Sequence, residues 1–351
     1  MVRTASATQV AESAAEALWL SALPQPSIEP VVGTLPAVVR PPVRFAHGVL
    51  AGLPGAVTDM AVSGDGRSLV LALYGADSVC VVDTATLSLA GVVSEVAEPY
   101  AVSVSDRAYL SSASMSGDSV VAVDLDFGVV LADRPVNAVA RGLATAPAGD
   151  AVYVARCGSE MADLVAVDVV SGNLRAIPVA RGADATVDTV RVTADGSRVF
   201  VTSLTAAGSA VVAIDTASAR VVQRVPVKGS ISDIAVHADC RRVISVGVDD
   251  RLGGVLRLVD TAEGRVTRTV ALGAIPTQLV LGRTRAFVLC GQVIAVVDVA
   301  TSRIVDTIDL GREASCLAMS PDAGTLYIAD FDGAVFARPL KTADPGLRAA
   351  S

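Results

Sequence analysis

The sequence has few of the residues from which most catalytic and metal sites are built. Only two of its 351 residues are His, and its five Cys are far apart, without a Cys-x-x-Cys pair. Structural zinc sites need closely spaced Cys and His ligands, so no metal site is indicated. Isolated Cys in odd number are typical of reduced thiols, and hence of a cytoplasm-like compartment.

Long apolar runs are also missing, although 52% of the residues are hydrophobic. No stretch of 18 or more consecutive apolar residues occurs, so we expect no membrane insertion. Polar side chains such as Thr4, Gln9 and Glu12 interrupt the N-terminal segment, which therefore does not resemble a secretory signal. A cytoplasmic location follows as the expectation, with export by a route that needs no signal peptide left open.

Clusters of basic residues are absent too. The chain has 28 Lys and Arg against 36 Asp and Glu, a formal net charge of −8, and the basic residues are scattered. Proteins that bind nucleic acid or anionic membranes present a concentrated basic surface. We therefore expect neither as a partner.

What the sequence does contain is a repeated apolar strand that ends in Asp. The pattern recurs about every 43 residues, at Asp83, Asp124, Asp168, Asp215, Asp260 and Asp298. The residues before each Asp are short apolar runs rich in Val and Ile, as in strands buried on both faces. Turn-forming residues follow, and we expect the carboxylate to accept a backbone N–H two residues on.

Each repeat holds four predicted strands. Two strands joined by a tight turn precede the Asp strand, as in 60–66 with 68–73. An alternating strand with one polar face follows it, as in 220–227 and 303–310. Seven such units predict an all-β fold, a seven-bladed β-propeller of four-stranded antiparallel blades.

The seventh repeat lacks its outer strand. After residues 334–338 the chain runs into Pro339, with Arg338 standing where Asp is due, 40 residues after Asp298. Residues 43–50 form an outer strand without a repeat of their own. We predict that this strand pairs with the segment near 334–338 and closes the ring.

The flanks differ in composition from the repeats and set the predicted domain boundaries. Residues 1–42 are expected to form an Ala-rich helix and then a linker with six of the 16 prolines, partly disordered. The helix either docks on a partner, caps the propeller or is a frayed appendage. The propeller is expected over 43–338, and residues 339–351 form a predicted disordered tail.

The repeats resemble the YVTN-type β-propeller family over about residues 43–338. The matching segments include Met60 to Gly66, Leu317 to Asp322 and Ala213 to Thr216, although the Tyr-Val-Thr-Asn string itself is absent. The resemblance implies the fold and carries little information on function. A Trp-Asp propeller is disfavoured, because the only Trp, Trp19, lies outside the repeats.

Candidate binding residues come from the inner strands. In a propeller the first strand of each blade lines the central channel, so the residues at its start crowd one mouth of the channel. Taken two per blade, these residues form a ring, which also contains Ala101, Gly142, Thr189 and Cys316. From this ring we predict ten ligand- or partner-binding residues: Thr58, Asp59, Tyr100, Arg141, Asp188, Ser232, Asp233, Thr277, Gln278 and Ser315.

These residues do not assemble into a recognisable catalytic set, and no cofactor is predicted. Asp59, Asp188 and Asp233 would suit a cation or, with Arg141, a zwitterion, but solvated rim charges are the simpler interpretation. His47 falls on the closing strand and His237 in a turn, both away from the channel. Among the thiols, only Cys316 lies at the mouth.

The favoured function is a non-enzymatic, monomeric scaffold that binds a protein or peptide across the channel mouth, an inference that rests partly on fold analogy. One alternative is a propeller enzyme, a lactonase-like hydrolase or a redox-enzyme subunit, which would contain bound metal or cofactor. Another is a small-metabolite sensor with a pocket around Tyr100, Arg141 and Asp188, which would show ligand-dependent melting.

Overall fold

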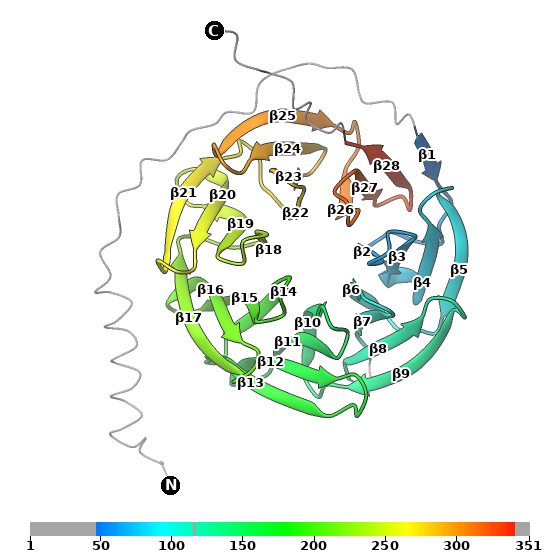
Figure 1. The fold of residues 1–351 in the computed structure, drawn as a ribbon, viewed down its shortest axis with the longest axis horizontal. Coiled ribbons are helices and arrows are strands. Elements are labelled where there is room, and N and C mark those ends of the chain that lie inside the picture. Colours follow the sequence, from blue (N-terminus) through cyan, green and yellow to red (C-terminus); the bar gives the residue numbers. More distant parts are fainter. Residues whose placement is uncertain (1–46, 115–116, 341–351) are drawn as a thin grey trace.

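The chain forms a ring of seven four-stranded antiparallel sheets around a central channel (Figure 1). The computed structural model describes residues 47–114 and 117–340. Each sheet is one blade, and its strands run from the channel to the rim in chain order, except that the first strand of the chain is outermost in the last blade. None of the helical segments in these residues has the length and apolarity to cross a membrane. The predicted fold class is confirmed.

The first four blades take the chain from β2 to β17. Blade 1 holds β2 (Asp59–Val62), β3 (Ser68–Leu73), β4 (Ser78–Asp83) and β5 (Ser88–Ser94), with the short 3-10 helix η1 (Tyr74–Ala76) between β3 and β4. Blade 2 holds β6 (Pro99–Val104), β7 (Ala108–Ser112), β8 (Ser119–Asp124) and β9 (Val129–Pro135). Blade 3 holds β10 (Val139–Thr145), β11 (Ala151–Cys157), β12 (Met161–Asp168) and β13 (Leu174–Arg181). Blade 4 holds β14 (Thr186–Val192), β15 (Arg198–Thr205), β16 (Gly208–Asp215) and β17 (Arg220–Val227).

The last three blades complete the ring. Blade 5 holds β18 (Asp233–Val236), β19 (Arg242–Asp249), β20 (Gly253–Asp260) and β21 (Arg265–Ala271). Blade 6 holds β22 (Gln278–Leu281), β23 (Arg285–Cys290), β24 (Val293–Asp298) and β25 (Arg303–Asp309). Blade 7 holds β26 (Ala314–Met319), β27 (Thr325–Asp330) and β28 (Val335–Pro339), and its outer strand is β1 (His47–Leu50).

The strand β1 closes the ring as the sequence predicts. It pairs antiparallel with β28, Val49 opposite Phe336 and Leu50 opposite Val335. The sheet edge that blade 7 would otherwise expose is thereby covered. The expected helix in residues 1–42 and the tail after Leu340 lie outside the described residues.

The six repeated Asp residues end the third strands and form the turns that follow. Oδ1 of Asp83 accepts the backbone N–H of Thr86 and its hydroxyl, at 2.8 and 2.7 Å. Asp168, Asp215 and Asp298 make the same pair of bonds three residues on. Asp124 and Asp260 accept the expected N–H two residues on as well as the one three residues on. The N–H groups two residues on also lower the pKa of Asp83, Asp168 and Asp298.

Arg338 does not occupy the position of the turn Asp, and that expectation is wrong. In blade 6 the pairing sets Arg285 opposite Asp298 and Ala286 opposite Val297. In blade 7 the equivalent pairs are Thr325 with Pro339 and Leu326 with Arg338. Pro339 therefore stands at the Asp position, and Arg338 replaces the preceding aliphatic residue.

The hydrophobic core is divided among the seven interfaces between blades. Each neighbouring pair of blades shares one cluster of buried residues, such as that of Phe200 with Ile234 between blades 4 and 5. The third strands are almost fully buried because they pack against both neighbours. Blades packed face to face in this way hold the inner strands at fixed positions around the channel.

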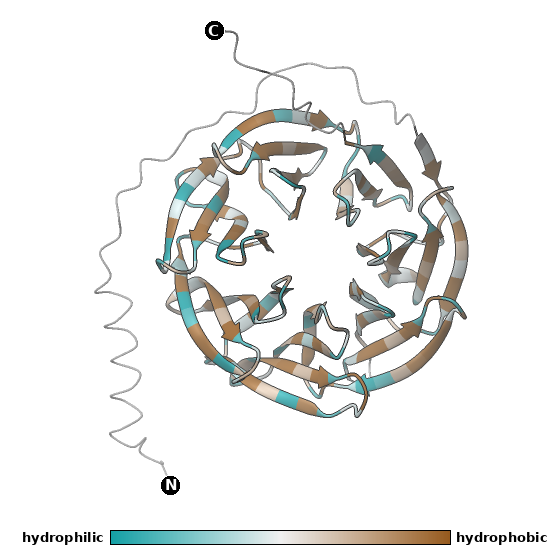
Figure 2. Ribbon diagram, in the orientation of Figure 1, coloured by the Kyte–Doolittle hydropathy of each residue, from teal (hydrophilic) through white to brown (hydrophobic). Residues whose placement is uncertain are grey.

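The outer strands are not all alike. Strand β17 carries polar bands in Figure 2, as the sequence predicts for a half-exposed strand. The outer strands of blades 1 and 2 expose more apolar side chains: Leu89, Val92, Val130 and Leu131 are each more than 40% exposed, whereas β17 exposes only Val222 to this extent. These two blades present an apolar edge to solvent.

Candidate functional site at the channel mouth

The inner strands enclose a cavity of about 630 Å³ along the propeller axis. Of the ten predicted binding residues, nine line it: Thr58, Asp59, Tyr100, Asp188, Ser232, Asp233, Thr277, Gln278 and Ser315. Arg141 does not, although it lies close enough to Tyr100 and Asp188 to act on the pKa of both side chains. The cavity is polar where the inner strands begin, whereas Val62, Val104, Leu281 and Met319 line it where they end.

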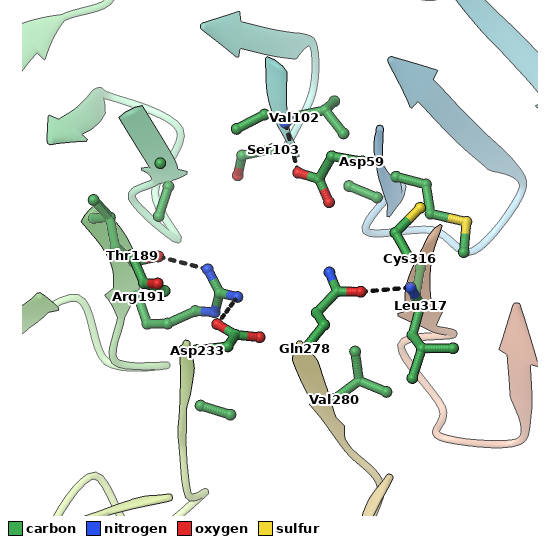
Figure 3. A pocket seen from close by; sticks show the side chains of 18 of the residues that line it. Asp59, Val102, Ser103, Thr189, Arg191, Asp233, Gln278, Val280, Cys316 and Leu317 are labelled. Carbon is green, nitrogen blue, oxygen red and sulfur yellow. Dashed lines mark hydrogen bonds and ion pairs between the residues drawn. The ribbon is translucent and has the colours of Figure 1, made fainter. Parts of the chain in front are cut away.

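Three polar side chains at the start of inner strands bind the backbone of the next blade, and Figure 3 draws these bonds for Asp59 and Gln278. Asp59 accepts the N–H of Val102 at 2.9 Å, and Asp233 accepts that of Leu279 at 2.9 Å. Gln278 does the same with the N–H of Leu317 at 2.6 Å. Thr58 also bonds to the next blade, but as the donor: its hydroxyl donates to the Pro99 carbonyl at 3.1 Å. These predicted ligand contacts are therefore engaged in joining blades.

Arg191 is a channel residue that sequence reasoning missed. It extends from β14 to Asp233 of blade 5, with Nη2 2.8 Å from Oδ1, and its Nη1 donates to the Val190 carbonyl (Figure 3). The residue one position after the buried inner-strand hydrophobe is small or apolar in the other blades: Ala61, Ser103, Ala144, Ala235, Val280 and Ala318. A lone Arg among such residues is the signal that could have identified it.

Burial changes the acidity of the channel carboxyls. Burial raises the pKa of Asp59 to about 6, against the opposing effects of the Val102 N–H and the Arg191 guanidinium. Asp233 is 4% exposed, and burial likewise raises its pKa although Arg191 and two backbone N–H groups stabilise the carboxylate. Both groups therefore act as hydrogen-bond acceptors in a poorly hydrated setting.

The rim between blades 2 and 4 has a different character. Tyr100 is 43% exposed there, close to Asp188 and Arg141. Asp188 is exposed as a residue, yet the surrounding blade ends keep water from its carboxyl and raise its pKa, with Arg141 opposing. At Gly142, between them, a Cβ would lie 2.6 Å from the Asp188 carbonyl, so only glycine lets blades 3 and 4 approach so closely.

The remaining candidates lie elsewhere or are shielded. Cys316 is 1% exposed, and burial, with the nearby Asp59, raises the pKa of its thiol well above the ordinary value. Cys80 and Cys290 are buried in strands, with thiol pKa values raised by burial to about 11 and 12. His237 lies in the turn after β18, where Asp239 and Arg242 contact it. Among residues 47–114 and 117–340, no three His, Cys, Asp or Glu gather in a way that could hold a metal ion.

Comparison with known proteins supports the architecture. The chain is 28% identical over 345 residues to the seven-bladed beta-propeller protein Rv1057 of Mycobacterium tuberculosis (strain ATCC 25618 / H37Rv), covering 86% of this chain and 85% of that protein. No family model matches, so the likeness to YVTN-type repeats stays a prediction.

A solved structure supports the same fold, and at this level of identity it supports the fold alone. Hydrazine synthase of Kuenenia stuttgartiensis is similar with a TM-score of 0.73 and 18% sequence identity, over 83% of this chain and 97% of that one. The repeat, the seven sheets and these two likenesses agree. The chain is a seven-bladed β-propeller whose last blade is completed by its N-terminal strand.

Proposed function

We propose that this propeller is a binding module whose channel mouth takes a segment of a protein or peptide. The observation that carries the proposal is the rim group of Tyr100, Arg141 and Asp188, an exposed aromatic ring beside one cation and one anion. Tyrosine and arginine dominate the binding energy of many interfaces, because they combine large contact area with directed hydrogen bonds. The rim group would therefore be the anchor of the contact.

The rest of the ring supports the proposal by its rigidity. Asp59, Asp233 and Gln278 each fix one blade to the next through a backbone N–H. A surface held in this way loses little conformational freedom when a partner binds, which favours affinity.

The test is capture of partners from lysate of the native source by three purified forms of the protein. The site variant is Tyr100→Ala/Arg141→Asp, and the matched control is Tyr74→Ala/Arg107→Asp, which makes the same changes at exposed residues outside the channel. We expect wild type and control to retain a common partner that the site variant loses. Equal retention by all three forms contradicts a contact at the mouth.

A small metabolite is the second candidate, and the size of the cavity favours it. A volume of about 630 Å³ falls within the range of small-molecule sites. A metabolite bound there would raise the melting temperature in proportion to the logarithm of its concentration. A screen of metabolites by thermal shift, repeated on the Tyr100→Ala/Arg141→Asp variant, separates this function from partner binding.

A further inference from the structure

Arg338 stands at a position that the other six blades fill with a buried aliphatic residue. The equivalent residues, paired with the start of the second strand, are Val82, Val123, Val167, Ile214, Val259 and Val297. All six are at most 5% exposed. Blade 7 is therefore the only blade with a cation at this position, where the fold needs only an apolar side chain.

A second cavity, of about 420 Å³, lies beside Arg338 between blades 6 and 7. Phe287, Val296 and Ile308, each less than 5% exposed, contribute an apolar wall. Arg283 and Arg285 line it as well. No residue lines both this cavity and the central channel. An apolar wall with a few convergent charged groups is the usual composition of a small-molecule site.

The protein does not satisfy every hydrogen-bond donor of the Arg338 guanidinium. Its Nη1 is buried and has no hydrogen-bond partner among the described residues. Burial lowers the pKa of its guanidinium, although the Asp306 carboxylate opposes this effect. The cavity lining contains three arginines but only two carboxylates, Asp306 and Asp322. Arg338 as a whole is half-buried, but a buried donor without a partner is costly unless an acceptor reaches it.

We propose that this cavity binds a small organic anion, a carboxylate or phosphate monoester with an apolar body. Its anionic oxygens accept hydrogen bonds from the Arg338 guanidinium, whose planar set of donors matches both groups. Its apolar body packs against Phe287, Val296 and Ile308. Arg283 already donates to the Asp322 carbonyl, at 3.2 and 3.3 Å, and so helps to shape the rim.

The test is calorimetric titration at constant ionic strength with phenyl phosphate, benzoate and inorganic phosphate. The site variant is Arg338→Val, which restores the residue type of the other blades and should fold at least as stably as wild type. The control is Arg268→Val, which removes an exposed cation from β21 in blade 5. Arg338→Lys keeps the charge but loses the planar donor set, and provides a folded variant if Arg338→Val does not fold.

The expected result is that wild type and Arg268→Val bind phenyl phosphate or benzoate alike, and that Arg338→Val and Arg338→Lys bind it at least about tenfold more weakly. Inorganic phosphate should bind more weakly than phenyl phosphate, because it cannot use the apolar wall. The proposal is overturned if no probe binds wild type at millimolar concentration, or if the Arg338 variants bind as well as wild type. Tighter binding of inorganic phosphate also contradicts it, since the apolar wall would then play no part.

Discussion

At the scale of single residues, the channel shows how one position can join neighbouring blades or face a ligand. Asp59, Asp233 and Gln278 occupy equivalent places on β2, β18 and β22, and each binds the N–H of the next inner strand. The same place holds Ala101, Gly142 and Thr189 in blades 2, 3 and 4. These contacts therefore concentrate in blades 5, 6 and 1, and the proposed binding residues Tyr100, Arg141 and Asp188 lie on the other side of the ring.

The raised pKa of Asp59 predicts a specific dependence of stability on pH. The carboxyl titrates near pH 6 in the folded protein and near its ordinary value of 3.8 in the unfolded chain. Between these values the folded state holds the extra proton, so the contribution of Asp59 to stability falls as pH rises from about 4 to 6 and is constant above. Asp59→Asn keeps an acceptor for Val102 but does not titrate. The free energy of unfolding of wild type relative to this variant should fall by up to about 3 kcal/mol over that range.

Urea denaturation of both proteins between pH 4 and 7 measures this difference. Asp65→Asn is the control, because Asp65 is exposed and bonds to Ser63 and Arg67 lower its pKa. Asp65 should therefore act with the opposite sign, its contribution being lost as pH falls. Parallel stability curves for wild type and Asp59→Asn would show that Asp59 is not perturbed.

At the scale of strands and blades, the spacing of the repeats predicts most of the architecture, although the chain has few aromatic residues. The regular Asp fixed the third strand of six blades, and the surplus strand at 43–50 identified the closure. The error at Arg338 has a simple cause, since Arg338 directly follows the apolar residues 334–337, whereas β28 continues to Pro339, the residue that pairs with Thr325. Partners across blades, such as Arg191 and Asp233, could not be predicted because they depend on how two blades are rotated against each other.

The contribution of β1 to closure can be measured with two truncations. A chain without residues 1–46 retains β1, and a chain without residues 1–50 lacks it, so the pair differs only by this strand. Loss of the three pairings with β28 removes about 3 kcal/mol of hydrogen bonding and should lower the melting temperature by roughly 5 °C. Circular dichroism measures the melting temperature of both truncations. Equal melting temperatures would contradict a stabilising role for the closing strand.

At the scale of the whole molecule, stability is distributed around a ring that has no end. Seven clusters at seven interfaces depend on one another, because opening one interface frees the neighbouring blades to move. Open repeat arrays instead lose repeats from their ends. A closed ring is therefore expected to unfold in a single transition wherever it is weakened.

Phe200→Ala tests this expectation. Phe200 is fully buried between blades 4 and 5, and its truncation should cost about 3–5 kcal/mol. Leu71→Ala makes a comparable cavity between blades 7 and 1, on the opposite side of the ring. Both variants should melt earlier in one transition with the same midpoint by near- and far-ultraviolet circular dichroism. Separate midpoints in either variant would show that blades unfold independently.

The pairing of β1 with β28 also sets the order in which the ring is completed during translation. Leu50 leaves the ribosome 285 residues before Val335, the residue that it faces in the finished sheet. Blades 1 to 6 have all their strands by then, whereas β1 waits unpaired for the last part of the chain. During that interval the same strand is able to complete blade 7 of a neighbouring copy, so crowded synthesis favours exchange of β1 between chains.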